Sequence, residues 1–353
     1  MLKTAPAVFA VDNEYQIMVP VERECLFWVR VGTEEFYDES NGILRSLSLL
    51  HRAHVPMELL DQEKAYTVCV RPLIERKPYY SETEPVQEFT FLFKPLPETD
   101  IRIYHIADTH NYVRHPVTAA AAFGGVDLLI LNGDVIDDSG NPEKFINVYQ
   151  ICDQITHGQV PVVFSRGNHD MRGNYAEAFA EYTPNHNGNT YYTFRLGALW
   201  GVVLDCGEDK ADHSIEYGHT VYCHDFRRRQ TAFLQALAGQ DDYKQAKYRI
   251  VVAHNPFTKR AEEDIFQIEE DVFTQWAELL KVVEPTLMLT GHYHRLRILP
   301  IGGEEDDFGQ PCPVVIGADR KQDYWAGCGI TLTDTVTVTF TDSEGQTLSK
   351  HTI

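Results

Sequence analysis

The pattern of apolar and polar positions changes in character near residue 94. Before that point, short stretches rich in β-branched and aromatic residues are separated by charged or turn-forming stretches, a pattern typical of β-strands. Within residues 66–73 apolar and polar side chains alternate, as they do in a strand with one exposed face. We therefore predict an all-β unit that forms a β-sandwich. Its predicted strands are residues 8–11, 15–19, 25–31, 66–73 and 86–93.

After residue 100 the chain consists of short continuous apolar runs separated by amphipathic stretches. Continuous apolar runs are typical of strands that are buried on both faces of a sheet. Between them, apolar residues such as Phe145, Val148 and Cys152 recur at helical spacing. Alternating strands and helices predict the α/β fold class. The predicted strands are residues 101–107, 128–132, 160–165, 248–253 and 286–290, with a further Thr- and Val-rich strand region at 329–340.

A polar stretch at residues 94–100, which contains Pro95 and Pro97, separates the two patterns. Proline lacks a backbone donor and favours extended or turn conformations, so this stretch is expected to be a linker. We therefore predict two domains, a β-sandwich at residues 1–97 and an α/β domain at residues 98–353.

The composition limits the classes of function and location. The formal net charge is −21, which disfavours binding to nucleic acid or to an anionic membrane surface. No apolar run approaches the ~20 residues of a membrane span, and the N-terminal segment lacks the apolar core of a signal peptide. The seven cysteines are scattered and never spaced as Cys-x-x-Cys, which fits a reducing compartment. We expect a cytoplasmic protein with no membrane partner.

Five of the apolar runs are closely followed by side chains that bind metal ions. Together these segments supply two Asp, one Asn and four His as donors, and no cysteine. Because open α/β sheets gather ligand sites at the carboxyl ends of their strands, these side chains are expected to converge. Oxygen and imidazole donors suit two adjacent ions of Mn, Fe, Zn, Co or Ni, whereas a structural zinc site commonly uses cysteine. The segments are Asp108-Thr109-His110, Gly133-Asp134, Gly167-Asn168-His169-Asp170, His254 and Gly291-His292-Tyr293-His294.

Each segment alone also has an ordinary structural explanation. Asp-x-His after a strand is commonly a cap or a surface turn, and a single buried histidine such as His254 usually has a hydrogen-bonded partner. The combination of all five segments in one order favours a metal site over these separate explanations. No Walker phosphate loop, Gly-x-Ser-x-Gly elbow or Gly-x-Gly-x-x-Gly motif offers competing chemistry.

The order of the five segments resembles that of the calcineurin-like metallophosphoesterase superfamily over residues 100–340. This resemblance implies a four-layer αββα sandwich with a dinuclear metal centre. It also implies that His169 lies beside the metal ions as a general acid. The implied metal ligands are Asp108, His110 and His294 for one ion, Asn168, His254 and His292 for the other, and Asp134 as a bridge between them.

The N-terminal part resembles the fibronectin-like or Ig-like domain that precedes the catalytic domain of purple acid phosphatases. The similar segments are His54-Val55-Pro56-Met57-Glu58-Leu59-Leu60 and Tyr66-Thr67-Val68. Two positions depart from that subfamily, which has Gly where this chain has His110 and a tyrosine ligand where it has Asp137. We therefore expect the domain layout of a purple acid phosphatase without its iron–phenolate chromophore.

The resemblance and the ligand types predict a metal-dependent phosphoric ester hydrolase that acts on a small phosphorylated substrate. A hydroxide bridging two metal ions would attack a phosphomonoester or phosphodiester, and His169 would protonate the leaving oxygen. Asp170 is predicted to orient or charge-stabilise that imidazole, with a helix N-cap as the alternative. Arg166 either faces substrate or forms a structural salt bridge, and Asn111 either supports the site or faces substrate.

Two other functions stay open at this point. A nuclease or cyclic-nucleotide phosphodiesterase would use the same site, although the acidic chain lacks a basic groove with interleaved aromatic residues. A catalytically weak binding or scaffold protein would instead use the N-terminal sandwich.

Two polar loops are expected near the site. Residues 205–229 either overhang the substrate or form a solvated loop in which the three arginines at 227–229 are exposed. The strongly acidic residues 257–271 are predicted to form a solvated lid or helix face rather than a binding element.

Overall fold

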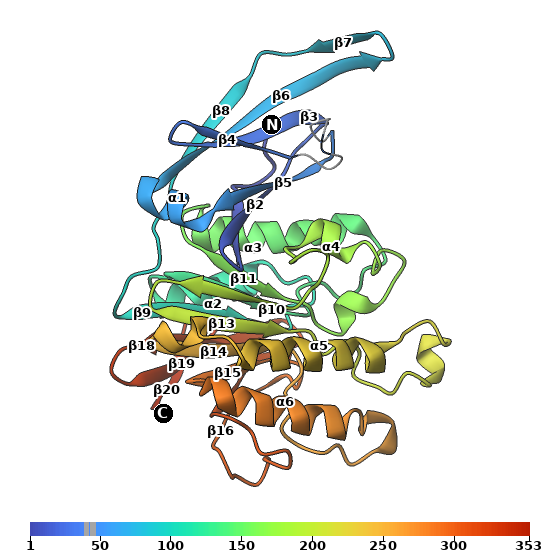
Figure 1. Ribbon diagram of the computed structural model, residues 1–353, viewed down its shortest axis with the longest axis vertical. Helices are drawn as coiled ribbons and strands as arrows, with labels where there is room; N and C mark the ends of the chain where they lie inside the picture. Colours follow the sequence, from blue (N-terminus) through green and yellow to red (C-terminus); the bar gives the residue numbers. More distant parts are fainter. Residues whose placement is uncertain (39–41, 43–46) are drawn as a thin grey trace.

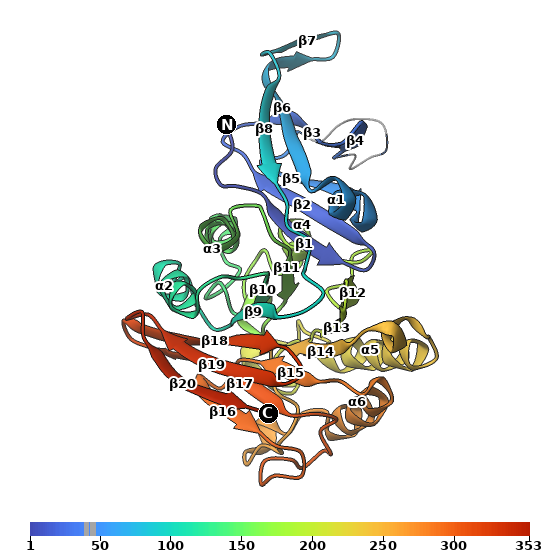
Figure 2. The same cartoon turned by 90° about the vertical axis from the view of Figure 1, so that its left-hand side faces the viewer.

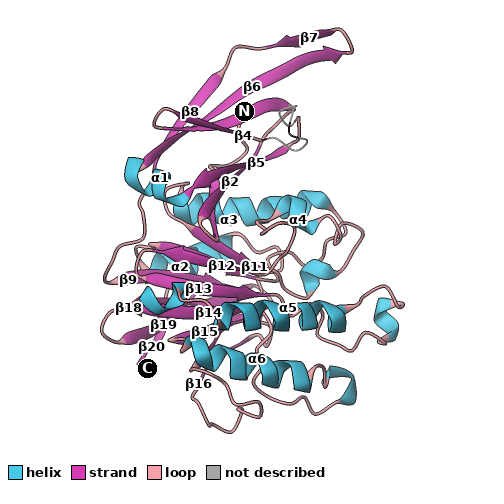
Figure 3. Ribbon diagram, in the orientation of Figure 1, coloured by secondary structure: helices cyan, strands magenta, loops and turns pink. Residues whose placement is uncertain are grey.

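A computed structural model describes residues 1–38, 42 and 47–353 of the chain (Figure 1). It contains a large mixed sheet of 15 strands and a smaller, separate antiparallel sheet of five strands. Strands run through the middle of the molecule and helices flank the large sheet (Figure 3). The predicted α/β class with a preceding all-β unit is therefore confirmed.

Two sets of parallel strands form the centre of the large sheet. The strands of this part of the chain, parallel and antiparallel together, are β9 (Ile101–Ile106), β10 (Leu128–Asn132), β11 (Val162–Ser165), β12 (Tyr192–Leu196), β13 (Leu199–Leu204), β14 (Tyr248–Ala253), β15 (Leu287–Thr290), β16 (Arg295–Leu299), β17 (Val314–Lys321), β18 (Tyr324–Leu332), β19 (Val336–Asp342) and β20 (Thr347–Thr352). In one half, β10 lies between β9 and β11 and is parallel to both. In the other half, β13, β14, β15 and β17 are parallel neighbours. The antiparallel strands β17 and β18 join the halves.

Three apolar clusters separate four layers. Along β10, Leu128 and Ile130 point into a cluster between the two halves of the sheet, whereas Leu129 and Leu131 point toward α2 and α3. Helices α5 and α6 cover the outer face of the other half through the third cluster. The two helix pairs lie on different sides of the strands in Figure 2. The helices are α1 (Met57–Glu63), α2 (Arg114–Phe123), α3 (Ile146–Thr156), α4 (Phe179–Tyr182), α5 (Cys223–Ala238) and α6 (Glu270–Val283).

The N-terminal part divides its strands between both sheets. They are β1 (Ala7–Val11), β2 (Glu14–Pro20), β3 (Cys25–Val31), β4 (Glu34–Tyr37), β5 (Leu50–Pro56), β6 (Ala65–Lys77), β7 (Tyr80–Thr83) and β8 (Gln87–Leu92). The order β4-β3-β6-β7, with β8 also beside β6, makes the small sheet. By contrast, β1, β2 and β5 continue the large sheet, because β1 pairs with β11 in parallel at Phe9 and Val162. The domain boundary at residue 97 stays a prediction, since hydrogen bonds cross from the first part into the second.

Two further features concern the whole chain. All seven cysteines are free and buried. Among the described residues, no helix combines the length and the apolar character needed to cross a membrane.

The pairing of β1 with β11 predicts that the first 97 residues are needed for the second part to fold. Removing them would expose one edge of β11 and the apolar surface around Phe164. A chain of residues 98–353 is therefore expected to be aggregated or poorly folded. Circular dichroism and thermal unfolding test this, and a soluble fragment with the unfolding transition of the full chain would contradict it.

A point substitution at Phe9 tests the contact between β1 and β11 in the full chain. Phe9 is fully buried and packs edge-on against Tyr149 and Phe164, with ring centroids 6.5 and 6.4 Å away. Phe9→Ala is expected to lower the free energy of unfolding by about 3–5 kcal/mol. Leu92→Ala, at a side chain that is 66% exposed, is the control and should change it little.

Candidate metal centre

The seven predicted metal ligands lie beyond the carboxyl ends of five strands and form one connected cluster. Carboxyl ends of parallel strands meet at one edge of a sheet, which brings together residues that are far apart in sequence. In chain order the ligands follow β9 (Asp108 and His110), β10 (Asp134), β11 (Asn168), β14 (His254) and β15 (His292 and His294).

Five of these seven residues have a left-handed backbone. This conformation is uncommon for residues with a Cβ atom, and it persists only where the surrounding structure imposes it. Such residues cluster at functional sites, so the presence of five of them in one cluster indicates a functional site. The residues are Asp108 (φ 53°), His110 (φ 42°), Asp134 (φ 51°), His292 (φ 70°) and His294 (φ 47°).

Glycines in these segments leave room for the ligand side chains. A Cβ atom on Gly133 would lie 2.5 Å from Nδ1 of His254, and one on Gly291 would lie 2.6 Å from Oδ2 of Asp108. Both distances are shorter than real Cβ contacts. The glycines are therefore required for close packing of the cluster, as the sequence pattern suggests.

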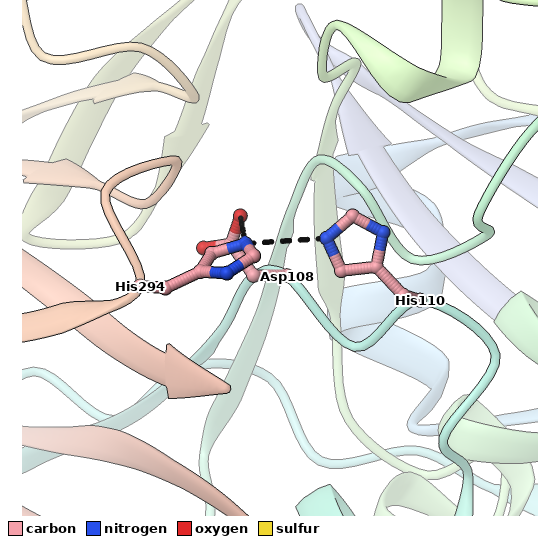
Figure 4. A group of neighbouring side chains, drawn as sticks. All are labelled: Asp108, His110 and His294. Carbon is pink, nitrogen blue, oxygen red and sulfur yellow. Dashed lines mark hydrogen bonds and ion pairs between the residues drawn. The ribbon is translucent and has the colours of Figure 1, made fainter. Parts of the chain in front are cut away.

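One group of donors consists of Asp108, His110 and His294 (Figure 4). Their ligand atoms all lie within 4.8 Å of one another. Nε2 of His294 is 3.3 Å from Oδ1 of Asp108 and 3.3 Å from Nε2 of His110. This is the set that the family resemblance assigns to one metal ion.

The second group centres on His254 and Asp134. Asp134 lies close to both groups, since its Oδ2 is 3.2 Å from Nε2 of His254 and 3.8 Å from Nε2 of His110. The remaining two predicted ligands lie together, with Nδ1 of His292 3.0 Å from Oδ1 of Asn168. The buried His and Asp clusters are consistent with a dinuclear metal site.

The orientation of the His254 ring fits a bound cation. Its Nδ1–H donates to the carbonyl oxygen of Asn132 at 2.7 Å, so Nε2 faces the carboxylates of Asp134 and Asp108. Nε2 is buried and has no hydrogen-bond partner among the described residues. A lone pair aimed at two carboxylates is repelled unless a proton or a cation lies between them. The donor set therefore suits a metal ion, and Asn132 fixes the ring for it.

The electrostatics of the cluster agree with this interpretation. Burial opposes protonation of His254, but the carboxylates of Asp134 and Asp108 outweigh it and raise its pKa to about 10. Burial also disfavours the charged carboxylates, yet His254 holds the pKa of Asp108 and Asp134 below the usual range. Burial lowers the pKa of His110 and His292 to about 4. The cluster thus combines ionised carboxylates with the neutral imidazoles of His110 and His292, while His254 carries a proton that a bound metal ion would displace.

His169 lies at the edge of the cluster and is held through one ring nitrogen. Its Nδ1–H donates to the carbonyl oxygen of Asp137 at 2.9 Å, and its backbone N–H donates to Oδ1 of Asp134 at 2.9 Å. The ring stands edge-on to His110 at 4.6 Å between centroids. Nε2 is therefore the ring nitrogen that is not held by backbone, and it accepts a 3.3 Å hydrogen bond from Nη1 of Arg172.

Asp170 contacts backbone rather than the imidazole of His169. Its Oδ2 accepts hydrogen bonds from the backbone N–H groups of Gly167, at 2.8 Å, and Asp134, at 3.1 Å. It is not an N-cap either, because Asn168 holds that position in the short helix His169–Met171. Burial, followed by the negative charge of Asp134, raises the pKa of Asp170 to about 8. Among the described residues Asp170 makes neither a hydrogen bond to the imidazole nor an N-cap, and it instead ties together two ligand-bearing loops; its charge stabilisation of His169 stays a prediction.

The two predicted substrate contacts also have structural partners. Arg166 donates through Nε to the buried Asp205 at 2.7 Å, which corresponds to the salt-bridge alternative. Asn111 accepts from Nδ2 of Asn147 at 3.0 Å, which corresponds to its supporting role. The carboxylate of Asp137, at the position of the tyrosine ligand of purple acid phosphatases, pairs with a lysine instead.

A charged network beside His169 was not predicted from the sequence. Arg172 donates to Oε2 of the buried Glu208 at 2.9 Å and to Oδ1 of Asp209 at 3.0 Å. Arg227 is fully buried and donates to the carbonyl oxygens of Cys206 and Glu208, so the alternative with three exposed arginines is wrong for Arg227 and right for Arg228 and Arg229. Its position seven residues before Leu234 on one helix face was a sequence signal for burial. The loop after β13 is therefore anchored beside the site.

The second polar loop also differs from its prediction. Part of residues 257–271 lines a cavity of about 360 Å³ together with His292 and Tyr293. The segment therefore has an inner face that lines a cavity, so it is not solvated throughout. The side chains of Glu262 and Glu263, in the same segment, are exposed to solvent, as predicted.

Comparisons with known proteins place the chain in a family. The sequence profile described as "Calcineurin-like phosphoesterase" matches residues 101–296. No curated protein matches the sequence. Purple acid phosphatase PPD1 from yellow lupin (Lupinus luteus) seeds has a similar structure, with a TM-score of 0.62 and 13% identity over 99% of this chain and 73% of that one. At this identity the likeness shows the fold alone.

Two other solved structures have lower scores. GAP50, the anchor in the inner membrane complex of Plasmodium, has a TM-score of 0.46 and 15% identity over 72% of this chain and 89% of that one. TT1561 of Thermus thermophilus has a TM-score of 0.41 and 15% identity over 72% of this chain and 99% of that one. The profile match covers more than half of the 353 residues, and all seven clustered donors lie within it. The chain belongs to the calcineurin-like phosphoesterase family.

Proposed function

We propose that this protein hydrolyses a phosphomonoester or phosphodiester with the help of two metal ions. The observation that carries this proposal is the buried Nε2 of His254, which faces the carboxylates of Asp108 and Asp134 without a hydrogen-bond partner in the described part of the chain. Asp108, His110 and His294 would hold one ion, and Asn168, His254 and His292 the other, with Asp134 shared between them. The N and O donors suit Mn, Fe, Zn, Co or Ni.

The chain's own residues supply positioning and proton transfer. Two bound divalent ions would polarise the phosphoryl group and provide a nucleophile at neutral pH. Because Nδ1–H of His169 is held by the Asp137 carbonyl, Nε2 is the atom that would exchange a proton with the leaving oxygen. Arg172 donates to Nε2 and is itself paired with Glu208 and Asp209, so it positions the His169 ring without adding net positive charge.

Two alternatives are less well supported. A nuclease needs a basic groove, but Arg166 and Arg172 beside the site are each paired with acidic residues, and the chain carries a net charge of −21. A binding or scaffold protein without activity usually lacks ligands, whereas this chain has all seven donors in one cluster. We also retain the expectation of a small phosphorylated substrate and a cytoplasmic location as part of this proposal.

Metal binding is expected to stabilise the folded chain. A ligand that binds only the folded state adds about 2.7 kcal/mol at 100 times its dissociation constant, so Mn²⁺ should raise the unfolding temperature of metal-free protein by a few degrees. Asp134→Asn should lose most of this shift. Asp137→Asn, a matched change on the same loop at a carboxylate paired with Lys144, should retain it. Equal shifts in both variants, measured by scanning calorimetry, would contradict the assigned ligands.

Replacing His169, the proposed general acid, should slow hydrolysis of the phosphoester without loss of the bound metal ions. His169→Ala is expected to lower kcat for an aryl phosphomonoester by about 10²–10⁴-fold while metal content stays unchanged. The exposed His351 on β20 provides the control His351→Ala, which should keep full activity. Steady-state rates with added Mn²⁺ and metal analysis of the purified variants test this. An unchanged kcat in His169→Ala would refute the assigned role, and turnover of oligonucleotides but not small esters would favour the nuclease.

A further inference from the structure

A cavity of about 360 Å³ opens directly beside the metal-binding cluster. Its lining includes His292, a predicted metal ligand, and Asn255, which follows the ligand His254. A phosphoryl group bound at the cluster would therefore have the rest of its molecule next to this cavity. The volume is in the range of pockets that bind small organic molecules.

Aromatic side chains form much of the cavity wall. Phe257, Phe273 and Phe308 are buried and form its base, with Phe257 and Phe273 stacked at 5.5 Å between centroids and an interplanar angle of 22°. Phe266 and Tyr293 keep part of their surface accessible, and Tyr293 is 39% exposed, although Lys210 lies over the Phe266 ring at 5.3 Å and Arg295 over the Tyr293 ring at 5.0 Å. A fixed base with two accessible rings suits a flat or apolar group, because aromatic surfaces are stabilised by stacking and by removal from water.

The basic side chains of the cavity are largely neutralised. Arg260 donates to Glu270 at 3.0 Å, and Arg295 donates to Glu305 at 2.6 Å. Lys259 also lines the cavity and adds one positive charge to it.

The acidic side chains of the cavity disfavour a ligand that carries a negative charge on its organic group in addition to its phosphoryl group. Glu262 and Glu263 are exposed at the cavity, and Asp209 also lines it while pairing with Arg172. A phosphate or carboxylate entering here would meet more acidic than basic groups, which is unfavourable at this range.

We propose that this cavity binds the organic group of the phosphoester substrate and selects a flat, uncharged group over an anionic one. This inference rests on the proposed function, since it takes the neighbouring cluster as the phosphoryl site. It predicts phosphoesters of small neutral aromatic alcohols as substrates, and it excludes esters that carry further phosphates or carboxylates on the organic group.

Non-hydrolysable phosphonates test the cavity separately from catalysis. We would titrate the full chain, loaded with Mn²⁺, with ethylphosphonate, benzylphosphonate and 4-carboxybenzylphosphonate in a calorimeter. Benzylphosphonate should bind roughly tenfold more tightly than ethylphosphonate, because the ring is buried against Phe266 and Tyr293. The added carboxylate should weaken binding several-fold relative to benzylphosphonate.

Substitutions of cavity residues test whether the cavity causes the differences in affinity among the three phosphonates. Phe266→Ala should remove most of the preference for the benzyl group, whereas Tyr80→Ala, at an exposed aromatic residue on β7, should keep it. Replacing Glu262 and Glu263 together by Gln should reduce the penalty for the carboxylate.

The outcomes separate this inference from the proposed function. Equal affinity for the ethyl and benzyl compounds, or tighter binding of the carboxylated compound, would overturn the proposed pocket alone, and no binding of any of them would overturn the pocket together with the phosphoryl site on which it rests. A preserved benzyl preference supports the pocket even if no phosphoester is hydrolysed with any metal ion, a result that would refute only the hydrolytic function.

Discussion

The central constraint on this structure is the burial of two carboxylates, Asp108 and Asp134, next to each other. Both are almost fully buried, and burying an uncompensated charge is strongly unfavourable. Backbone N–H groups compensate part of the charge, since His292 donates to Asp108 at 2.9 Å and His169 donates to Asp134 at 2.9 Å. The imidazole of His254 compensates another part. A pair of divalent cations would complete this balance and would take the place of the proton on His254.

The rest of the fold holds this arrangement in place. Asn132 links the two halves of the sheet at the site, because its amide donates to the carbonyl oxygens of Ala253 and Leu289. The glycines beside the ligands allow the loops to approach closely, and Asp170 ties the loop of Asp134 to that of Gly167. The left-handed backbone of the ligands is thus supported by contacts from several strands. Support also comes from the N-terminal part, since its strand β1 covers the edge of β11.

The sequence anticipated the clustering of the Asp and His donors because its signals are local. Each ligand follows an apolar strand, and parallel strands bring such residues to one edge of the sheet. The features that were missed depend on contacts between distant segments. The pairing of β1 with β11 joins Phe9 to Val162, and no local pattern specifies that partner. The contacts of Asp170 and Arg227 with backbone groups likewise follow from how loops pack, although the helical position of Arg227 did indicate burial.

The proposed centre requires two metal ions that share Asp134. Titration of metal-free protein with Mn²⁺, followed by electron paramagnetic resonance, tests this most directly because neighbouring Mn²⁺ ions are magnetically coupled. We expect two ions per chain with the spectrum of a coupled pair, and loss of that coupling in Asp134→Asn. One ion per chain with the spectrum of an isolated Mn²⁺ would contradict the dinuclear site.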